Sequence, residues 1–211
     1  MQNFFSEKRP HNGLTYEEYY AELKNKSELT DYTSYPEEEK EHLNLTKINF
    51  QRVNRIHKTF SAGSKLLEVV SKIKEEQLWM VLSEDWCGDS AQVLPYFAEI
   101  AKLNANIKLR ILLRDKNLDI MDQYQTNRTR SIPKLVAFDL EGNELYQWGP
   151  RPKAAVELIA KLKGEGKTKE EFLEQLHLWY ARNRGVEILN ELLDLIKPTV
   201  KQLAVVPKRK T

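Results

Sequence analysis

The residue best suited to chemistry in this chain is its only cysteine, Cys87. It belongs to the run Trp-Cys-Gly-Asp-Ser at residues 86–90, between an apolar run at 78–82 and a run at 91–103 with apolar residues at helical spacing. A lone cysteine is often just a small buried apolar side chain. At a strand-to-helix turn, however, unpaired N–H groups and the helix dipole favour a negative charge. We therefore expect Cys87 to be a nucleophile whose thiolate is populated near neutral pH.

The residues around Cys87 indicate redox chemistry. Ser90 stands three places after Cys87, where a C-x-x-C redox motif has its second cysteine. With this motif the chain resembles the thioredoxin superfamily. Residues 84–89, together with the segments 126–134 and 148–152, resemble a group of uncharacterised bacterial thioredoxin-like proteins. The resemblance implies that Cys87 and Ser90 are catalytic, and that Trp86, Gly88 and Asp89 line the substrate groove.

Two further segments carry the resemblance. Pro95 stands inside the predicted helix after the motif, where the family has a proline, and residues 131–136 look like the family's cis-proline segment. The resemblance implies that Pro133 is the cis-proline and that the Ile132–Pro133 peptide lies beside the sulfur and binds substrate. Arg130, and Arg128 before it, are expected to meet glutathione carboxylates through bidentate contacts, with solvated surface arginines as the alternative.

The chain departs from the family at two positions. Ser90 replaces the resolving cysteine, and the family's buried acidic residue falls by register on Val81. Without a second thiol, the site cannot itself release a mixed disulfide formed by Cys87. We therefore expect monothiol exchange, in which Cys87 takes the glutathionyl group from a mixed disulfide and a second small thiol resolves it.

Two alternatives to exchange stay open. The chain could be a non-catalytic binding or adaptor module that holds a client through the cis-proline groove, because one fold carries many tasks. It could also be a redox sensor in which Cys87 is oxidised to sulfenic acid. None of these three functions implies a prosthetic group or a metal, and glutathione enters only as a co-substrate.

Three carboxylates surround the thiol. Glu84 and Asp85 precede the motif and Asp89 lies within it. They could accept a proton, but uncompensated carboxylates also raise a thiol pKa. One of Glu84 and Asp85 is also a candidate helix cap.

The elements that position this motif follow from apolar periodicity. It predicts helices at 64–74, 91–103, 117–124 and 152–163, and strands at 78–83, 107–112, 134–138 and 144–148. Gly142 supplies the turn of a hairpin between the last two strands. This order matches an α/β, thioredoxin-like mixed sheet covered by helices on both faces. The strands joined by a crossover helix should pair in parallel, and the strands joined by the hairpin should pair antiparallel.

The resemblance covers residues 62–164, which we take as the core. Residues 1–61 and 165–211 are expected to be N- and C-terminal helical extensions, with helices at 16–25, 43–60 and 169–196 whose apolar faces pack on the core. The acidic run 37–41 reads as the first turns of a solvated helix after Pro36.

Composition narrows the range of partners. Lys plus Arg number 33 and Asp plus Glu 31, a formal net charge of +2 that gives no reason to expect nucleic acid or membrane. The N-terminal residues lack the order of a secretory signal, and one cysteine makes no internal disulfide, so we expect a cytoplasmic protein. The expected partners are thiols and disulfides of proteins or glutathione. No metal site is expected, because the four histidines show no metal-ligand spacing with cysteine: His11, His42, His57 and His177.

Overall fold

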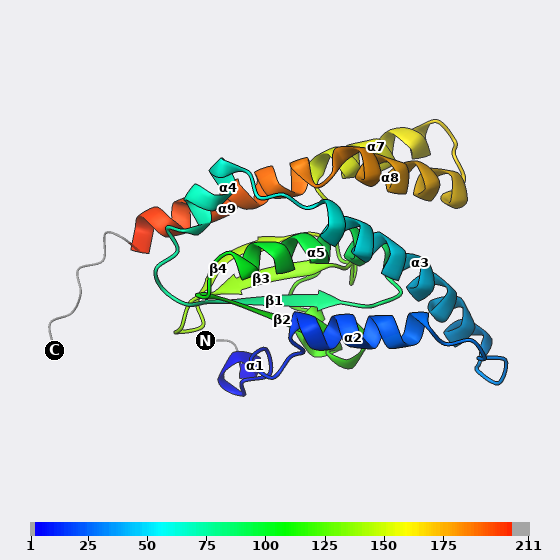
Figure 1. The fold of residues 1–211 in the computed structure, drawn as a ribbon, viewed down its shortest axis with the longest axis horizontal. Helices are drawn as coiled ribbons and strands as arrows, with labels where there is room; N and C mark the ends of the chain where they lie inside the picture. Colours follow the sequence, from blue (N-terminus) through cyan, green and yellow to red (C-terminus); the bar gives the residue numbers. More distant parts are fainter. Residues whose placement is uncertain (1–2, 204–211) are drawn as a thin grey trace, which may run out of the picture.

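A four-stranded mixed sheet forms the centre of the protein (Figure 1). The computed structural model describes residues 3–203. The strands are β1 (Gln77–Ser83), β2 (Ile107–Leu113), β3 (Lys134–Phe138) and β4 (Glu144–Trp148), in the order β2-β1-β3-β4. β1 pairs parallel with β2 and antiparallel with β3, and β3 pairs antiparallel with β4. The predicted α/β class and both pairing modes are therefore confirmed.

Helices precede, interrupt and follow the sheet along the chain. They are α1 (Asn3–Ser6), α2 (Tyr16–Ser27), α3 (Glu37–Thr59), α4 (Ser64–Val70), α5 (Gly88–Lys102), the 3-10 turn η1 (Arg114–Lys116), α6 (Leu118–Met121), α7 (Lys153–Gly164), α8 (Lys169–Asn183) and α9 (Val186–Leu203).

Both faces of the sheet are covered, and the sequence of β1 explains why. Successive side chains of a strand point to opposite faces. Trp79 and Val81 join an apolar cluster with α4, α5 and α9, whereas Met80 and Leu82 join a second cluster with α1 and α6. All seven residues of β1 are buried, as expected for a continuous apolar run packed on both sides.

The extensions pack on the core as predicted. Tyr19 and Leu23 of α2, Val53 and Ile56 of α3, and Leu176 of α8 belong to the same apolar cluster as α5. α3 therefore lies against α5, the helix that follows the motif (Figure 1).

Several predicted boundaries differ from the structure. α3 begins at Glu37, so the acidic run forms its first turn after Pro36 as predicted, and it continues without a break into the helix predicted at 43–60. The helix predicted at 169–196 is two helices, α8 and α9, separated where Arg184 and Gly185 adopt positive φ angles of 51° and 80°. α6 is one turn, shorter than the predicted 117–124. Residues 204–211 of the predicted C-terminal extension lie outside the described residues.

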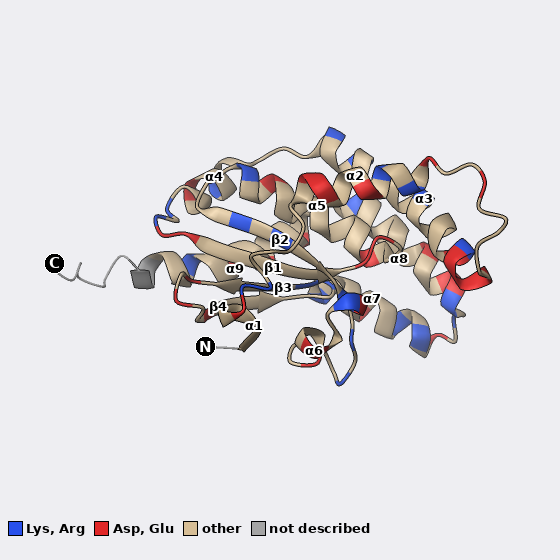
Figure 2. Ribbon diagram, turned by 90° about the horizontal axis from the view of Figure 1, so that it is seen from below, with Lys and Arg blue, Asp and Glu red and all other residues tan. Residues whose placement is uncertain are grey.

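Charges of both signs alternate over the helices in Figure 2. Of the helices within residues 3–203, none combines the length and apolarity needed to cross a membrane.

Candidate functional site

Cys87 is the N-cap residue of α5, directly after the loop that ends β1. Its sulfur accepts a hydrogen bond from the backbone N–H of Ser90 at 3.5 Å. The thiol in turn donates to the carbonyl oxygen of Ile132, also at 3.5 Å. The Ile132–Pro133 peptide bond is cis. The structure thus brings together the motif and the proline segment, which are some 45 residues apart in the chain.

The environment of the thiol differs from the expectation. Cys87 is only 8% exposed and packs in the apolar cluster that includes Leu82 and Ile132. Burial, and secondly the charge of Asp89, raise the pKa of the Cys87 thiol. The Ser90 hydroxyl and the amides of Ser90 and Asp89 lower this pKa, but their combined effect is smaller. The expectation of a thiolate near neutral pH is therefore wrong, because desolvation outweighs the helix N-terminus.

Ser90 is fully buried beside the sulfur. Its hydroxyl helps to lower the thiol pKa. Within the described residues, however, Ser90 Oγ has no partner that meets normal hydrogen-bond geometry. A catalytic part for Ser90 stays a prediction.

Asp89 is buried in a polar contact network. Its Oδ1 accepts a hydrogen bond from the hydroxyl of Tyr180 in α8 at 2.9 Å. Its Oδ2 forms an ion pair with Arg151 Nη2 at 2.5 Å. Asp89 is thus held by the turn after β4 and by the C-terminal extension.

Trp86 forms part of the rim beside the thiol. It is partly buried, and its indole stacks on His42 of α3 with ring centroids 4.8 Å apart. The guanidinium of Arg114 lies 5.0 Å from the centre of the indole ring. Residues of α3 and of η1 thus hold the indole in place, and the groove-lining role of Trp86 stays a prediction.

Arg130 is bound elsewhere on the surface. Its guanidinium forms a bidentate ion pair with Asp122 at 2.7 and 2.8 Å, and both side chains are exposed. A substrate carboxylate would have to displace Asp122 from Arg130. The substrate contact predicted for Arg130 stays a prediction.

Glu84 and Asp85 connect the motif to its surroundings. Glu84 Oε1 accepts a hydrogen bond from the backbone N–H of Asp115 at 2.8 Å. The pKa of Glu84 is raised, chiefly by burial. Asp85 pairs with Lys26 of α2, and its carbonyl accepts the amide of Asn49 at 2.8 Å. Neither residue caps α5, because Cys87 occupies the N-cap position.

The structure adds residues that the sequence did not single out. Arg52 and Arg55 of α3 and His177 of α8 lie over the first turn of α5. An ideal Cβ on Gly88 would be 2.8 Å from His177 Cε1 and 3.2 Å from Arg52 Nη1. Arg55 donates to Gln92 Oε1 at 2.7 Å. Nothing in the local sequence links these residues to Cys87, since they reach it from other elements.

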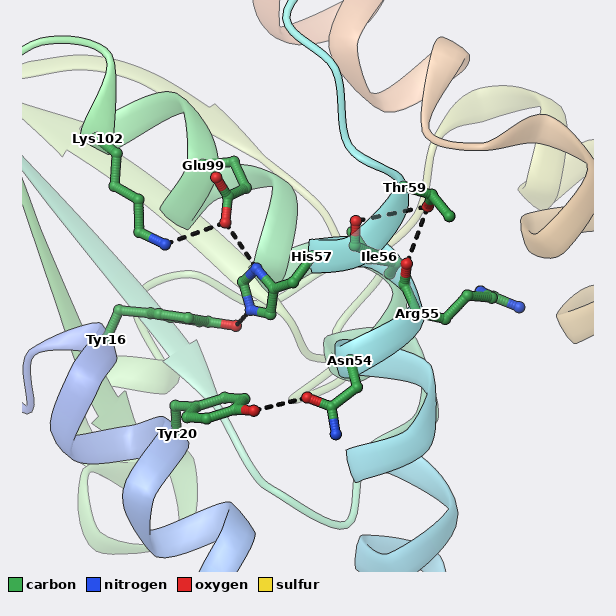
Figure 3. Close-up of polar contacts among 9 residues, drawn as sticks. All are labelled: Tyr16, Tyr20, Asn54, Arg55, Ile56, His57, Thr59, Glu99 and Lys102. Carbon is green, nitrogen blue, oxygen red and sulfur yellow. Dashed lines mark hydrogen bonds and ion pairs between the residues drawn. The ribbon is translucent and has the colours of Figure 1, made fainter.

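His57 belongs to a separate polar cluster, drawn in Figure 3, where α2, α3 and α5 meet. Its Nε2 is 2.7 Å from the hydroxyl of Tyr16, and its Nδ1 is 2.6 Å from Glu99 Oε1, which also pairs with Lys102 at 3.0 Å. Tyr20 adds a hydrogen bond to Asn54 at 2.6 Å. Arg55 points away from His57 on α3, toward the other side of that helix (Figure 3). The cluster ties the N-terminal helices to α5.

Comparisons with known proteins agree on the fold. A family model described as thioredoxin matches residues 36–163, which include α3 as well as the sheet and α5. A crystal structure of a protein of unknown function, PA1234 from Pseudomonas aeruginosa, is similar with a TM-score of 0.60 at 17% identity. A crystal structure of an HIV epitope scaffold is similar with a TM-score of 0.59 at 16% identity. Each alignment covers 90% of this chain and 95% of the other.

No curated protein matches the chain significantly. The resemblance to a particular bacterial group with a single-cysteine motif stays a prediction. The family match itself spans more than half of the chain and contains Cys87 and Pro133. The chain therefore belongs to the thioredoxin family.

Proposed function

We propose that this protein carries out monothiol thiol–disulfide exchange through Cys87. The Cys87 thiol loses its proton to solvent, and the thiolate attacks one sulfur of a disulfide R–S–S–R′. A Cys87–S–S–R bond forms and R′–S⁻ leaves. The thiolate of a second small thiol, such as glutathione (GS⁻), then attacks the R sulfur of the mixed disulfide. A GS–S–R bond forms, the bond between Cys87 and R breaks, and the Cys87 thiolate is restored.

One observation carries the proposal. The sulfur of Cys87 lies at the N-terminus of α5 and 3.5 Å from the Ile132 carbonyl, next to the cis peptide bond of Pro133. In this arrangement an extended substrate that binds beside the sulfur would lie along the backbone that leads into the cis peptide bond. Cys87 is also the only thiol, which supports a second thiol from outside the chain.

Burial of the thiol sets the expected pH dependence. Because the pKa of Cys87 is raised, the neutral thiol predominates at pH 7 and only a small fraction is nucleophilic. Exchange should therefore accelerate with pH to beyond about 8.5, the pKa of a free cysteine. A protein that depends on a free thiol suits a reducing compartment, and we propose the cytoplasm.

Mass spectrometry tests the proposal. The protein is incubated with a glutathionylated peptide at several pH values, and the mass of the intact chain is followed. We expect a glutathionyl adduct on Cys87, faster at higher pH, that disappears when reduced glutathione is added. The Cys87→Ser variant is the control and should form no adduct. A wild-type chain that alkylates at Cys87 but never takes up glutathione would contradict exchange.

A second candidate function is a binding module without turnover. Its support is the low exposure of Cys87, 8%, together with the packing of Trp86 against His42 and Arg114. If this candidate holds, a peptide that binds beside Pro133 should bind the wild type and the Cys87→Ser variant equally well. Exchange instead predicts that covalent capture occurs only with Cys87.

A further inference from the structure

Three arginines converge on the first two turns of α5, where Cys87 is the N-cap. Arg52 and Arg55 come from α3, and Arg151 from the turn between β4 and α7. All three side chains are half-buried. We call Arg52, Arg55 and Arg151 the arginine cluster.

The positive charge of the arginine cluster is only partly balanced. Arg151 pairs with the carboxylate of Asp89 at 2.5 Å. Arg52 and Arg55 bind neutral amide oxygens instead, Asn49 Oδ1 at 2.8 Å and Gln92 Oε1 at 2.7 Å. Within residues 3–203, no carboxylate oxygen comes within 4.0 Å of either. Arg52 and Arg55 thus form no ion pair in a partly desolvated place, although the charge of Asp89 acts on Arg52 from beyond contact distance.

His177 adds a neutral hydrogen-bond donor to the same place. Gln92 Oε1 accepts from Arg55, so the Gln92 amide nitrogen must donate, and it lies 3.3 Å from His177 Nδ1. His177 Nδ1 is therefore the acceptor and Nε2 carries the proton. Burial, and then the charges of the arginine cluster, lower the pKa of His177 to about 4, so the ring is neutral at pH 7.

The donors are gathered beside the reactive residue. His177 Nε2 and Arg52 Nη1 lie 3.0 and 3.2 Å from the point that a Cβ on Gly88 would occupy. Gly88 directly follows Cys87. These two donors therefore stand over the residue that follows Cys87 in the chain.

We propose that the arginine cluster and His177 bind a carboxylate of the substrate whose sulfur exchanges with Cys87. This inference rests on the proposed function and narrows its substrate class to disulfides that carry a carboxylate near the sulfur, such as an acidic peptide. Guanidinium groups suit this ligand because their planar donors match the two oxygens of a carboxylate. Two half-buried guanidinium groups that form no ion pair would be stabilised by such a ligand.

Two small disulfides of different charge test the inference. The rate of mixed-disulfide formation at Cys87 is measured with 3,3′-dithiodipropionate, a dicarboxylate, and with bis(2-hydroxyethyl) disulfide, which is neutral. N-acetylcysteine amide is the reference thiol. The preference is the rate with the dicarboxylate divided by the rate with the neutral disulfide. We expect this ratio to be at least about tenfold larger for the protein than for the reference thiol, and to fall with added salt.

Variants assign the preference to residues. The double variant Arg52→Gln/Arg55→Gln should lose the preference for the dicarboxylate, measured as the ratio of its rates with the two disulfides, so that any change common to both rates cancels. Arg182→Gln, which removes an exposed arginine outside the arginine cluster, is the matched control and should keep the preference. A preference no larger than that of the reference thiol, or one that survives in the double variant, would overturn the inference.

A binding measurement separates this inference from the proposed function. If the wild type does not react even with the neutral disulfide, exchange fails, but the anion site can still be tested. In the folded Cys87→Ser variant, succinate should shift the Gly88 amide resonance saturably. The shift should be absent when Arg52→Gln and Arg55→Gln are added. No shift, or an equal shift in both proteins, would rule out the site.

Discussion

At the scale of single residues, Cys87 is subject to opposing electrostatic effects. The amides of Asp89 and Ser90 favour the thiolate, as expected at a helix N-terminus. Loss of hydration and the charge of Asp89 act against it and prevail. The thiol is therefore kept neutral at rest by the same buried position that brings it to Ile132.

The contribution of Asp89 can be measured. The Asp89→Asn variant removes the negative charge, so the pKa of the Cys87 thiol should fall and the rate–pH profile of alkylation by iodoacetamide should move to lower pH. Tyr180→Phe is the control, because it removes only the hydrogen bond to Asp89 and leaves the charge. A profile that does not move in Asp89→Asn would show that burial alone raises the pKa.

Ser90 allows a test of the redox geometry. In the Ser90→Cys variant, the new thiol stands in the C-x-x-C spacing beside Cys87, and mild oxidation should form an internal disulfide. The measurement is the loss of two hydrogens in the intact mass and of free thiols. Ser83→Cys, at another fully buried serine with an unsatisfied Oγ, is the matched control. Two persistent free thiols in a folded Ser90→Cys protein would contradict the geometry.

At the scale of elements, the turn between β4 and α7 holds the proline segment and Asp89 in place. Gly149 adopts a φ of 119°, and a Cβ on it would come within 2.2 Å of the carbonyl oxygen of Pro133. Two residues later, Arg151 pairs with Asp89. The close approach of the two backbones thus positions one member of the arginine cluster.

Gly149→Ala should be strongly destabilising. The side chain would meet a backbone oxygen and the φ angle is unfavourable for alanine, so we expect a loss of at least about 2 kcal/mol in the free energy of unfolding. Gly164→Ala is the control, since a Cβ there meets nothing within 4 Å. Urea denaturation of both variants measures the difference. A loss below about 0.5 kcal/mol in Gly149→Ala would contradict the packing.

At the scale of the whole molecule, both extensions take part in the site. α3 supplies Arg52, Arg55 and His42, and α8 supplies His177 and Tyr180. These helices lie over the N-terminal end of α5 while their apolar sides join its core cluster. The extensions therefore shape the surroundings of Cys87 in addition to enlarging the core.

His177 couples the stability of the molecule to pH. Its pKa is about 4 in the folded protein and about 6.5 when unfolded, so between these values only the unfolded chain binds a proton there. The free energy of unfolding should therefore fall as pH decreases from 6.5 to 4, with a contribution of at most about 1.4 kcal/mol per pH unit. In His177→Gln this part of the slope should vanish. Equal slopes in both proteins would contradict the buried, neutral imidazole.

Local patterns in the sequence were enough to predict much of the core. The continuous apolar run at 78–82 predicted β1, Gly142 predicted the hairpin, and the apolar spacing after Cys87 predicted α5. These predictions were possible because the periodicity of a strand or helix depends on residues that are close together in the chain. The break at Arg184 and Gly185 was missed. Gly185 is a local helix-ending signal, and in the fold it also lies against the ring of Tyr96, which is distant in the chain.

The sequence by itself determined that a lone cysteine heads a helix within a mixed sheet, with a proline segment to pair with it. Only the tertiary structure decided what surrounds that cysteine. Arg52 and His177 meet at Gly88 and Arg151 pairs with the neighbouring Asp89, from three separate elements. The raised pKa of Cys87 follows from burial and from the charge of Asp89. Desolvation and through-space charge depend on which distant residues pack together, and no local pattern in the chain specifies that packing.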